Sequence, residues 1–350
     1  MKNIAIYAPD IFFNDAVGNY CLGLARLIEN HFIKISLFAE RFASNTSIKI
    51  QNSQNLFELD LTHYILFINY SIYDPQLDKL LALNCKKIIY CHGVTPYQFF
   101  RGWDSATEEM CRKAIHQLII LNKCDTLITN SKSTKKFLSK YINTENSYVM
   151  PPVFFNNGIF NEDVYILQSQ EISRIQLIMI GRVTPHKNLE DGLLFLRNLL
   201  HKDIDGQLVI AGHIQNKEYF EYILELSRHM GILNKLHFTG SLPDKFLLKY
   251  LKASHLLLSM SKHEGFGVPV LEAMHLGIPT LVRSGTATDE LAYNSLINPK
   301  ELKNSNSQFY DFEFLKKYMR EVKVKNKQIS MKLLSKTTVE EYISLFNRMN

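Results

Sequence analysis

The chain has 350 residues, 46% of them hydrophobic and 21% charged, and this ordinary globular composition predicts two domains that each bury a core. No stretch approaches the ~18 apolar residues of a membrane span, and residues 1–10 predict a buried strand instead of a signal peptide. The net charge of +6 gathers in residues 316–336, and nucleic acid is not an expected partner because its binders more often spread basic charge beside aromatic side chains. We expect a cytoplasmic protein, soluble or attached peripherally to the inner face of the cytoplasmic membrane.

The alternation of short apolar runs with segments of helical periodicity is the βαβα pattern of a parallel sheet. In the first half, the predicted strands are 4–8, 33–38, 64–69, 87–91, 126–129 and 147–150. Pro151 and Pro152 end this series, because proline removes a backbone donor and restricts the residue before it. A second series follows, with predicted strands 175–180, 207–211, 235–239, 255–259 and 279–282.

The sequence therefore predicts an α/β fold with two doubly wound, Rossmann-like domains, at residues 1–150 and 175–334. Residues 151–174 are the predicted linker, and residues 335–350 a C-terminal helix that packs back toward the first domain. Ligands of such sheets bind beyond the carboxyl ends of the strands. The predicted site is the cleft between the two domains.

The five cysteines show neither a CxxC pair nor a repeated spacing; they are Cys21, Cys85, Cys91, Cys111 and Cys124. Zinc sites and disulfide frameworks both use regular spacings. The pattern therefore predicts reduced thiols in apolar surroundings, with no bound zinc.

Two segments of the second domain have the composition of a phosphate site. Residues 181–188 (GRVTPHKN) follow a predicted strand, and their Gly181, Arg182 and Lys187 suit a diphosphate that must approach the backbone closely. Residues 263–274 (HEGFGVPVLEAM) follow another strand and open a helix, whose first N–H groups favour an anion.

Within the segment 263–274, Glu264 and Glu272 stand eight positions apart, and an ionised carboxylate can accept hydrogen bonds from two neighbouring hydroxyls of a sugar or ribose. Other strand ends add weaker candidates. Gly212 follows the strand at 207–211. Gly240 and Ser241 follow the strand at 235–239, where they could meet a nucleobase or a ribose.

The segments GRVTPHKN, VIAGH, LHFTGSL and SKHEGFGVPVLEAMHLGIPTL occur in this order and resemble the retaining glycosyltransferases of family 4, which have the GT-B fold. The resemblance is strong over residues 175–295 and weaker over the rest of the chain. Glu264 and Glu272 match the E-x7-E motif of that family, its most specific marker.

The resemblance implies a role for each matching residue. Arg182 and Lys187 would neutralise the pyrophosphate of the donor, Glu264 would contact hydroxyls of the donor sugar, and Glu272 would contact the ribose. The backbone of Phe266, Gly267 and Val268 would contact the sugar and the phosphate.

In the first domain, the family usually has two glycines after the first strand, whereas residues 14–19 here contain Gly18 alone. Gly18 is the corresponding candidate for a phosphate contact. His92 follows a predicted strand in YCHGVTP, and the resemblance implies that it lies beside the reacting carbon and binds a distal hydroxyl of the sugar. Asn130 and Ser131 follow another strand and could line the acceptor side.

These features predict a hexosyltransferase that takes a mannose- or glucose-type sugar from a GDP- or UDP-linked donor. A saccharide or lipid-linked saccharide would be the acceptor, in lipopolysaccharide or other surface polysaccharide synthesis. No DxD-like pair stands in a convincing loop, and we expect no metal and no cofactor. The alternatives are a nucleotide-sugar epimerase or phosphorylase of GT-B fold, and a non-catalytic nucleotide-sugar-binding subunit.

Two basic segments could rest on an anionic membrane. Residues 316–336 contain eight lysines and arginines against Glu321. In the first domain, a predicted helix carries Lys132, Lys135, Lys136 and Lys140, and aromatic residues lie close to the His92 loop; the aromatic residues are Phe99, Phe100 and Trp103. For both segments, a solvated lysine face is the alternative.

Overall fold

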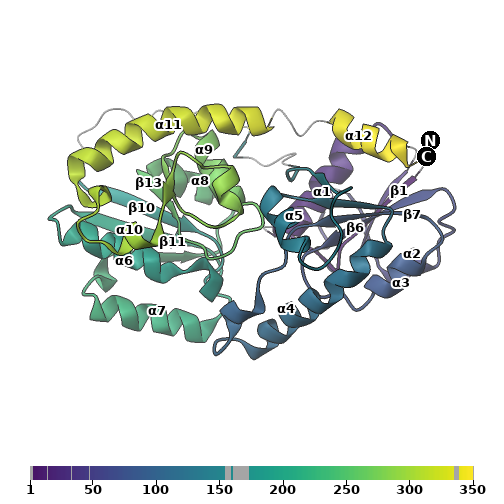
Figure 1. Cartoon of the computed structure of the whole chain (residues 1–350), viewed down its shortest axis with the longest axis horizontal. Coiled ribbons are helices and arrows are strands. Elements are labelled where there is room, and N and C mark those ends of the chain that lie inside the picture. Colours follow the sequence, from purple (N-terminus) through teal and green to yellow (C-terminus); the bar gives the residue numbers. More distant parts are fainter. Residues whose placement is uncertain are drawn as a thin grey trace. The chain divides into compact units, whose positions relative to one another are not determined.

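The computed structural model describes residues 3–13, 15–32, 34–46, 48–153, 159–160, 173–334 and 339–349. The chain divides into two compact units (Figure 1). Unit 1 comprises Met1–Tyr97, Glu109–Asn156 and Leu333–Asn350, and unit 2 comprises Gln98–Glu108 and Asn157–Lys332. Most of the predicted linker, residues 154–158 and 161–172, lies outside the described residues.

Unit 1 contains a seven-stranded parallel sheet with the order β5-β3-β1-β6-β7-β8-β9. Its strands are β1 (Asn3–Tyr7), β3 (Ile35–Ala39), β5 (Ile50–Asn52), β6 (Tyr64–Tyr70), β7 (Lys86–Cys91), β8 (Thr126–Thr129) and β9 (Tyr148–Val149). A small second sheet pairs β2 (Asp10–Ile11) with β4 (Arg41–Phe42). Every residue of β6 is buried, as expected for a central strand that helices cover on both faces.

The helices of unit 1 pack on both faces of this sheet. They are α1 (Ala16–Ile28), α2 (Gln54–Phe57), α3 (Leu77–Ala82), α5 (Lys132–Leu138), α12 (Val339–Arg348) and most of α4 (Ser105–Gln117), with the 3-10 turns η1 (Tyr97–Phe100) and η2 (Leu118–Lys123). Ile4 and Ile6 share a core with α1 and α12, whereas Ala5 and Tyr7 share a core with α3 and α4. This alternation along β1 makes the sheet doubly wound.

Helix α12, at the far end of the chain, completes the first of these cores. Tyr342 and Phe346 are fully buried. The Tyr342 hydroxyl lies 2.8 Å from the Tyr20 hydroxyl of α1, and the Phe346 ring lies edge-on to Phe32 at 5.2 Å. Residues 335–338 of the predicted C-terminal segment lie outside the described part of the chain.

Unit 2 contains a six-stranded parallel sheet with the order β12-β11-β10-β13-β14-β15. Its strands are β10 (Ile175–Ile180), β11 (Gly206–Ala211), β12 (Leu236–Gly240), β13 (Leu256–Ser259), β14 (Thr280–Arg283) and β15 (Leu296–Ile297). Its helices are α6 (Leu189–Leu200), α7 (Lys217–His229), α8 (Asp244–Ala253), α9 (Val268–His275), α10 (Pro299–Lys303) and α11 (Phe312–Leu334), with the 3-10 turns η3 (Pro185–Lys187), η4 (Leu233–Lys235), η5 (Ala287–Glu290) and η6 (Gln308–Tyr310).

The α/β fold with two parallel sheets, predicted from the sequence, is confirmed. Every predicted strand corresponds to an observed one, mostly within one or two residues at each end. The sequence did not predict β2, β4, β5 and β15, which have two or three residues each. Such short strands lack an apolar run that stands out from a loop.

Candidate active site

Three glycines mark the carboxyl edge of the unit 2 sheet. Gly181 follows β10, Gly212 follows β11 and Gly240 ends β12. The Gly181 N–H donates to the Ala211 carbonyl at 2.9 Å, and the Gly212 N–H donates to the Gly240 carbonyl at 3.0 Å. A Cβ atom on Gly212 would lie 2.0 Å from the Gly181 carbonyl oxygen, so glycine is required for the two loops to approach this closely.

Lys187 ends the short turn η3 that follows β10 and forms an ion pair with Glu264. Its Nζ donates to Glu264 Oε1 at 2.6 Å across 77 residues of sequence. Ser261 Oγ donates to the same oxygen at 2.7 Å. The Lys187 and Glu264 side chains are only 17% and 14% exposed, so solvent screens this pair less than a surface pair.

The Glu264 carboxyl is ionised in this environment. Burial raises its pKa, but the charge of Lys187 and the hydrogen bonds from Lys187 and Ser261 outweigh burial, and the net pKa lies below its ordinary value. The carboxylate therefore orients the Lys187 side chain through the 2.6 Å hydrogen bond. An ammonium has three N–H donors, so a bond to Glu264 leaves two for a ligand oxygen.

The turn that carries Lys187 is also fixed to the loop after β13. The Lys262 N–H donates to the His186 carbonyl at 2.8 Å, and the Asn188 Nδ2 donates to the Met260 carbonyl at 2.9 Å. Asn188 adopts a left-handed conformation with φ of 54°, which asparagine tolerates better than most residues. These bonds position Lys187 through the His186 carbonyl before it and the Asn188 side chain after it.

Two neutral histidines flank the ion pair. Burial lowers the pKa of His186 well below its ordinary value, and the charges of Lys187 and Arg182 act in the same direction. Burial lowers the pKa of His263 to about 4, although Glu264 opposes this shift. Neither imidazole therefore adds positive charge to the site at neutral pH.

Helix α9 begins after the second predicted segment. Gly267, its N-cap, has φ of 99°, and a Cβ atom there would lie 2.3 Å from Thr288 Cγ2. Val268 opens the helix and is followed by Pro269, which has no N–H, while the N–H groups of Val270 and Leu271 donate to the Gly267 carbonyl at 3.0 and 3.2 Å. The backbone at Gly267 and Val268 therefore lies at the positive end of the helix dipole. Glu272 and Phe266 are 6% and 7% exposed. The start of α9 thus suits an anion.

The structure brings several predicted residues together. Gly181 and Lys187 line a cavity of about 20 Å³ with Ser261, the hydrogen-bond partner of Glu264. A cavity of this size holds roughly one water molecule, so most of a larger ligand would lie outside it. Arg182 is exposed directly after Gly181, and Ser241 is exposed after β12.

His92, at the end of β7, belongs to unit 1 and is held by a chain of hydrogen bonds. The Asn69 Nδ2 donates to the Tyr7 carbonyl at 3.1 Å, so Asn69 Oδ1 is an acceptor, 2.9 Å from His92 Nε2. Burial lowers the pKa of His92 to about 3. Nε2 therefore carries the proton of a neutral ring, which leaves Nδ1 as an acceptor. Asn130 Nδ2 donates to the His92 carbonyl at 2.8 Å.

Gly18 has a packing role in the structure. Its N–H donates at 3.1 Å to Asp15, the N-cap of α1. A Cβ atom on Gly18 would lie 2.2 Å from the Phe12 carbonyl oxygen. The phosphate contact predicted for Gly18 stays a prediction, and so does the cleft between the two domains. Ser131 caps α5 by accepting from the Thr134 N–H at 3.0 Å.

Sequence reasoning missed the residues that hold the candidate side chains in place. Asn69 orients His92, and Ser261 supports Glu264. Asn69 lies in no distinctive motif, and Ser261 opens the segment SKHEGFGVPVLEAMHLGIPTL, in which the candidate residues begin at Glu264. Asn188 did carry a signal, because an asparagine directly before a helix suits a left-handed residue.

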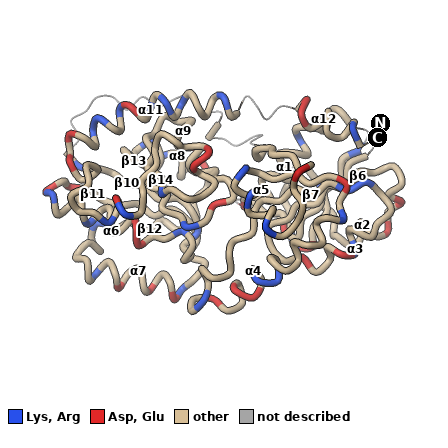
Figure 2. The backbone as a smooth tube through the Cα atoms, viewed as in Figure 1, with Lys and Arg blue, Asp and Glu red and all other residues tan. Residues whose placement is uncertain are grey.

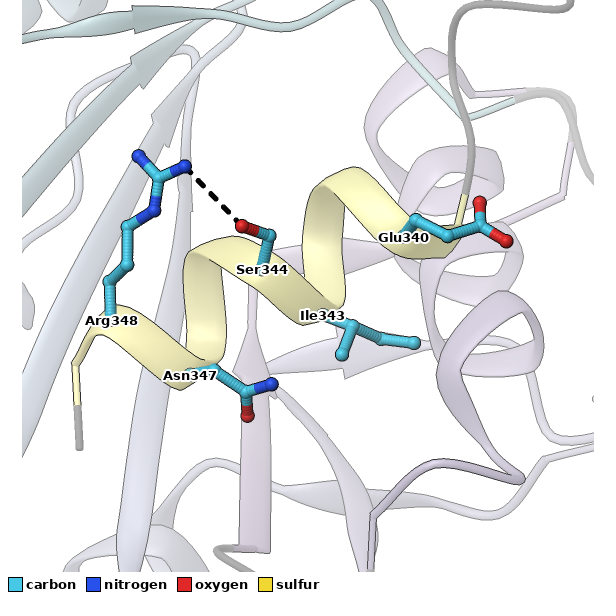
Figure 3. Close-up of a pocket in the computed structure, with 5 residues that line it drawn as sticks. All are labelled: Glu340, Ile343, Ser344, Asn347 and Arg348. Carbon is cyan, nitrogen blue, oxygen red and sulfur yellow. Dashed lines mark hydrogen bonds between the residues drawn. The ribbon is translucent and has the colours of Figure 1, made fainter.

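A wider hollow of about 470 Å³ lies on the surface of α12 (Figure 3). It is lined by Glu340, Ile343, Ser344, Asn347 and Arg348. Within it, Arg348 Nη2 donates to Ser344 Oγ at 3.3 Å. None of these five residues carries a predicted function.

No three histidine, cysteine, aspartate or glutamate side chains among the described residues gather closely enough to hold a metal ion. None of the helices that these residues form has the length and apolar character needed to cross a membrane.

Comparison with known proteins matches residues 167–294 to the family described as glycosyl transferases group 1. An uncharacterized glycosyltransferase of Methanocaldococcus jannaschii is 28% identical over 183 residues, 49% of this chain and 46% of that protein. The serotype-specific mannosyltransferase WbdA of Escherichia coli is 32% identical over 133 residues, 37% of this chain and 16% of that protein. The chain therefore spans less than half the length of these relatives.

Among solved structures, Anabaena HepE, crystallised with UDP and glucose, matches 98% of this chain and 100% of its own length. The TM-score is 0.71 at 13% sequence identity, so this likeness concerns the fold. The family match and the shared fold agree with the motifs that were identified in the sequence. Residues 167–294 therefore match the group 1 glycosyltransferase family, and the two parallel-sheet units of the chain have the GT-B fold.

Proposed function

We propose that the protein is a retaining hexosyltransferase, which moves a mannose- or glucose-type sugar from a GDP- or UDP-linked donor to a saccharide or lipid-linked saccharide. The observation that carries this proposal is the half-buried Lys187–Glu264 ion pair at the carboxyl edge of the unit 2 sheet. A structural ion pair could lie anywhere in the fold. This one lies beside Gly181, in a segment that the family match covers.

In this reaction, the bond between the sugar and the diphosphate breaks, and the departing nucleoside diphosphate takes the electron pair. Preorganised cations and N–H dipoles aimed at that growing negative charge are the largest available source of acceleration. Lys187, held by Glu264, and the exposed Arg182 supply the cations. The backbone of the turn at residues 265–268 and the positive end of the α9 dipole supply the dipoles. No metal or cofactor is part of this proposal.

The remaining candidates take roles that suit their chemistry. Glu264 has a second carboxylate oxygen that can accept from a hydroxyl of the donor sugar, and Glu272 can accept from the ribose hydroxyls. Gly212 and Ser241 follow strands at the same sheet edge. His92 presents Nδ1 as an acceptor for a distal sugar hydroxyl, because Asn69 fixes the proton on Nε2.

The comparisons support the donor class. WbdA is named as a mannosyltransferase, and the HepE structure contains UDP and glucose. These two proteins point to different sugars, so the base and the sugar of the donor stay open between GDP-mannose and a UDP-hexose. The name of WbdA, a serotype-specific enzyme, also supports surface polysaccharide synthesis as the setting.

Thermal unfolding in the presence of GDP, UDP, GDP-mannose, UDP-glucose and UDP-galactose tests the donor proposal. A ligand at a hundred times its Kd stabilises the folded protein by about 2.7 kcal/mol. We therefore expect the nucleotides of one base to raise Tm by several degrees and those of the other base to have little effect. No shift with any of these ligands contradicts the proposal. Conversion of a nucleotide-sugar in the absence of an acceptor favours the epimerase alternative.

We also propose that the protein works at the inner face of the cytoplasmic membrane and contacts anionic lipid through α11. Figure 2 shows lysine and arginine positions repeated along this helix. Its exposed basic residues are Lys317, Arg320, Lys325 and Lys332. The same helix exposes Val324 and Met331, at 60% and 58%. Exposed apolar side chains among basic ones suit the interface of an anionic bilayer.

The second predicted membrane surface, around α5, loses its aromatic anchors. Phe100 is only 4% exposed, and Trp103 packs on Tyr219 and Tyr222 within unit 2. The sequence grouped these rings with the lysines because both fall within the predicted first domain, but residues 98–108 belong to unit 2.

Cosedimentation with vesicles of phosphatidylglycerol and phosphatidylethanolamine at low salt tests the contact through α11. We expect a variant in which glutamine replaces the four exposed basic residues to lose this binding; the residues are Lys317, Arg320, Lys325 and Lys332. Each basic residue near an anionic surface contributes about 1 kcal/mol. The matched control replaces Lys132, Lys135, Lys136 and Lys140 of the α5 region with glutamine and is expected to keep binding. Loss of binding in the control variant alone assigns the contact to α5, and an absence of salt-sensitive binding in the wild type removes the membrane proposal.

A further inference from the structure

Residues 98–108 form a short excursion of the chain into unit 2. The residues before and after them, Tyr97 and Glu109, belong to unit 1. The excursion contains the end of η1, a turn and the first residues of α4. In Figure 1, the chain just before α4 lies against the start of α7, in agreement with the contacts of Trp103. We call residues 98–108 the strap.

The first contact of the strap is on the turn that carries Lys187. The Phe100 ring lies 5.6 Å from the His186 ring in an edge-on arrangement. Both residues are buried, at 4% and 6% exposed. His186 is the neighbour of Lys187, and its carbonyl accepts the Lys262 N–H at 2.8 Å. Phe100 thus packs on a residue that joins the two loops of the ion pair.

The second contact is with the start of α7. The Trp103 carbonyl accepts from Asn216 Nδ2 at 2.8 Å. The Trp103 ring lies edge-on to Tyr219 at 5.4 Å and tilted on Tyr222 at 5.2 Å. Asn216 also caps α7, because its Oδ1 accepts the Tyr219 N–H at 2.6 Å.

Tyr219 carries this second contact back to the Lys187 turn. Its hydroxyl accepts the Leu189 N–H at 3.0 Å and donates to Glu190 Oε2 at 2.5 Å. Leu189 is the first residue of α6 and lies two positions after Lys187. The strap therefore acts on both sides of Lys187: through Phe100 on the residue before it, and through Trp103 and Tyr219 on the helix that follows it.

From these contacts we propose that the strap holds Lys187 in the position in which it binds the donor diphosphate, with Phe100 and Trp103 as positioning residues. This inference rests on the proposed function. A displacement of about 1 Å in a binding group can cost two orders of magnitude in rate. In this arrangement, the effect of Phe100 passes through His186 and the effect of Trp103 passes through Tyr219.

The test compares Trp103→Ala and Phe100→Leu with wild type in donor titrations. Both variants are expected to raise the KM of the nucleotide-sugar and the Kd of its nucleoside diphosphate by about ten-fold or more, as a misplaced binding group would, with the KM of the acceptor unchanged. Trp103→Phe keeps an aromatic ring and is expected to restore most of the donor affinity. Phe246→Ala, at a half-exposed ring on α8, is the control and is expected to bind as wild type does.

A second measurement needs no variant, because Trp103 is the chain's single tryptophan. Coupling between two sites is reciprocal, so a strap that favours diphosphate binding must itself be stabilised when the diphosphate binds. The quenching of Trp103 fluorescence by acrylamide is expected to fall on addition of UDP or GDP, with the Kd that calorimetry gives.

The outcomes separate the two proposals. A wild-type protein that binds no nucleoside diphosphate contradicts the proposed function itself. The strap proposal is contradicted if both strap variants bind the diphosphate with normal affinity and the quenching of wild-type Trp103 does not change when the diphosphate is added. The proposed function would still stand in that case. A uniform loss of affinity for donor and acceptor, together with a large fall in Tm, assigns the strap to overall stability instead.

Discussion

Replacing Lys187 with methionine is expected to lower kcat/KM for the nucleotide-sugar by about 10²–10³-fold, the usual effect of removing one preorganised donor from a charged transition state. Methionine keeps most of the length and apolar stem of lysine but has no N–H group to offer the departing diphosphate. Steady-state kinetics with the donor selected by thermal unfolding measures this loss. A variant within ten-fold of wild type would show that Lys187 does not serve the reaction.

The same substitution leaves Glu264 in a half-buried site without its cation, and such a loss destabilises the fold by itself. The double variant Lys187→Met/Glu264→Gln separates the two effects. A neutral amide can still accept from Ser261, whose hydroxyl lies 2.7 Å from the carboxylate. We expect the double variant to recover most of the Tm but none of the activity. Recovery of activity together with Tm would make the pair purely structural.

Replacing Gly267 with alanine is expected to cost donor affinity and stability together. Gly267 has φ of 99°, and an added Cβ atom would lie 2.3 Å from Thr288 Cγ2. A left-handed conformation costs a residue with a side chain ~1–3 kcal/mol, and the overlap with Thr288 adds an overpacking cost of similar size. The start of α9 must then shift, which moves the N–H groups proposed to bind phosphate.

Gly285 is a matched control, since it has φ of 104° but no atom within 4 Å of an added Cβ. Gly285→Ala is expected to lower Tm through backbone strain alone and to keep the donor affinity. Thr288→Ser removes the Cγ2 methyl, so Gly267→Ala/Thr288→Ser is expected to regain part of the lost affinity. Equal donor affinities of Gly267→Ala and Gly285→Ala would mean that the start of α9 does not contact the donor. Calorimetric titration of the nucleoside diphosphate measures all three variants.

Much of the fold could be predicted from the sequence, because buried parallel strands are continuous apolar runs. The strand β6 (YILFINY), with every residue buried, is the clearest example. The motifs that follow such strands were also visible, since Gly181 and Gly267 stand where the chain needs conformations or contacts that exclude a side chain. Local patterns therefore gave the candidate residues, though not their contacts.

The contacts depend on packing between residues that are far apart in the chain. Nothing in the sequence pairs Lys187 with Glu264, which are 77 positions apart. Nor does any local signal place Phe100 and Trp103 in unit 2, while the residues on either side of the strap belong to unit 1. For Gly18, the sequence showed only a glycine near a helix start, where the structure shows a backbone contact with Phe12.

The central claim is that Lys187 recognises the terminal phosphate of a nucleoside diphosphate. Calorimetric titration of GDP, GMP, UDP and UMP into the wild type and Lys187→Met tests it most directly. We predict that the wild type binds the diphosphate of one base at least about ten-fold more tightly than its monophosphate, which corresponds to 1.4 kcal/mol, and that this difference disappears in the variant. A preference for the diphosphate that survives the loss of Lys187 would contradict the claim.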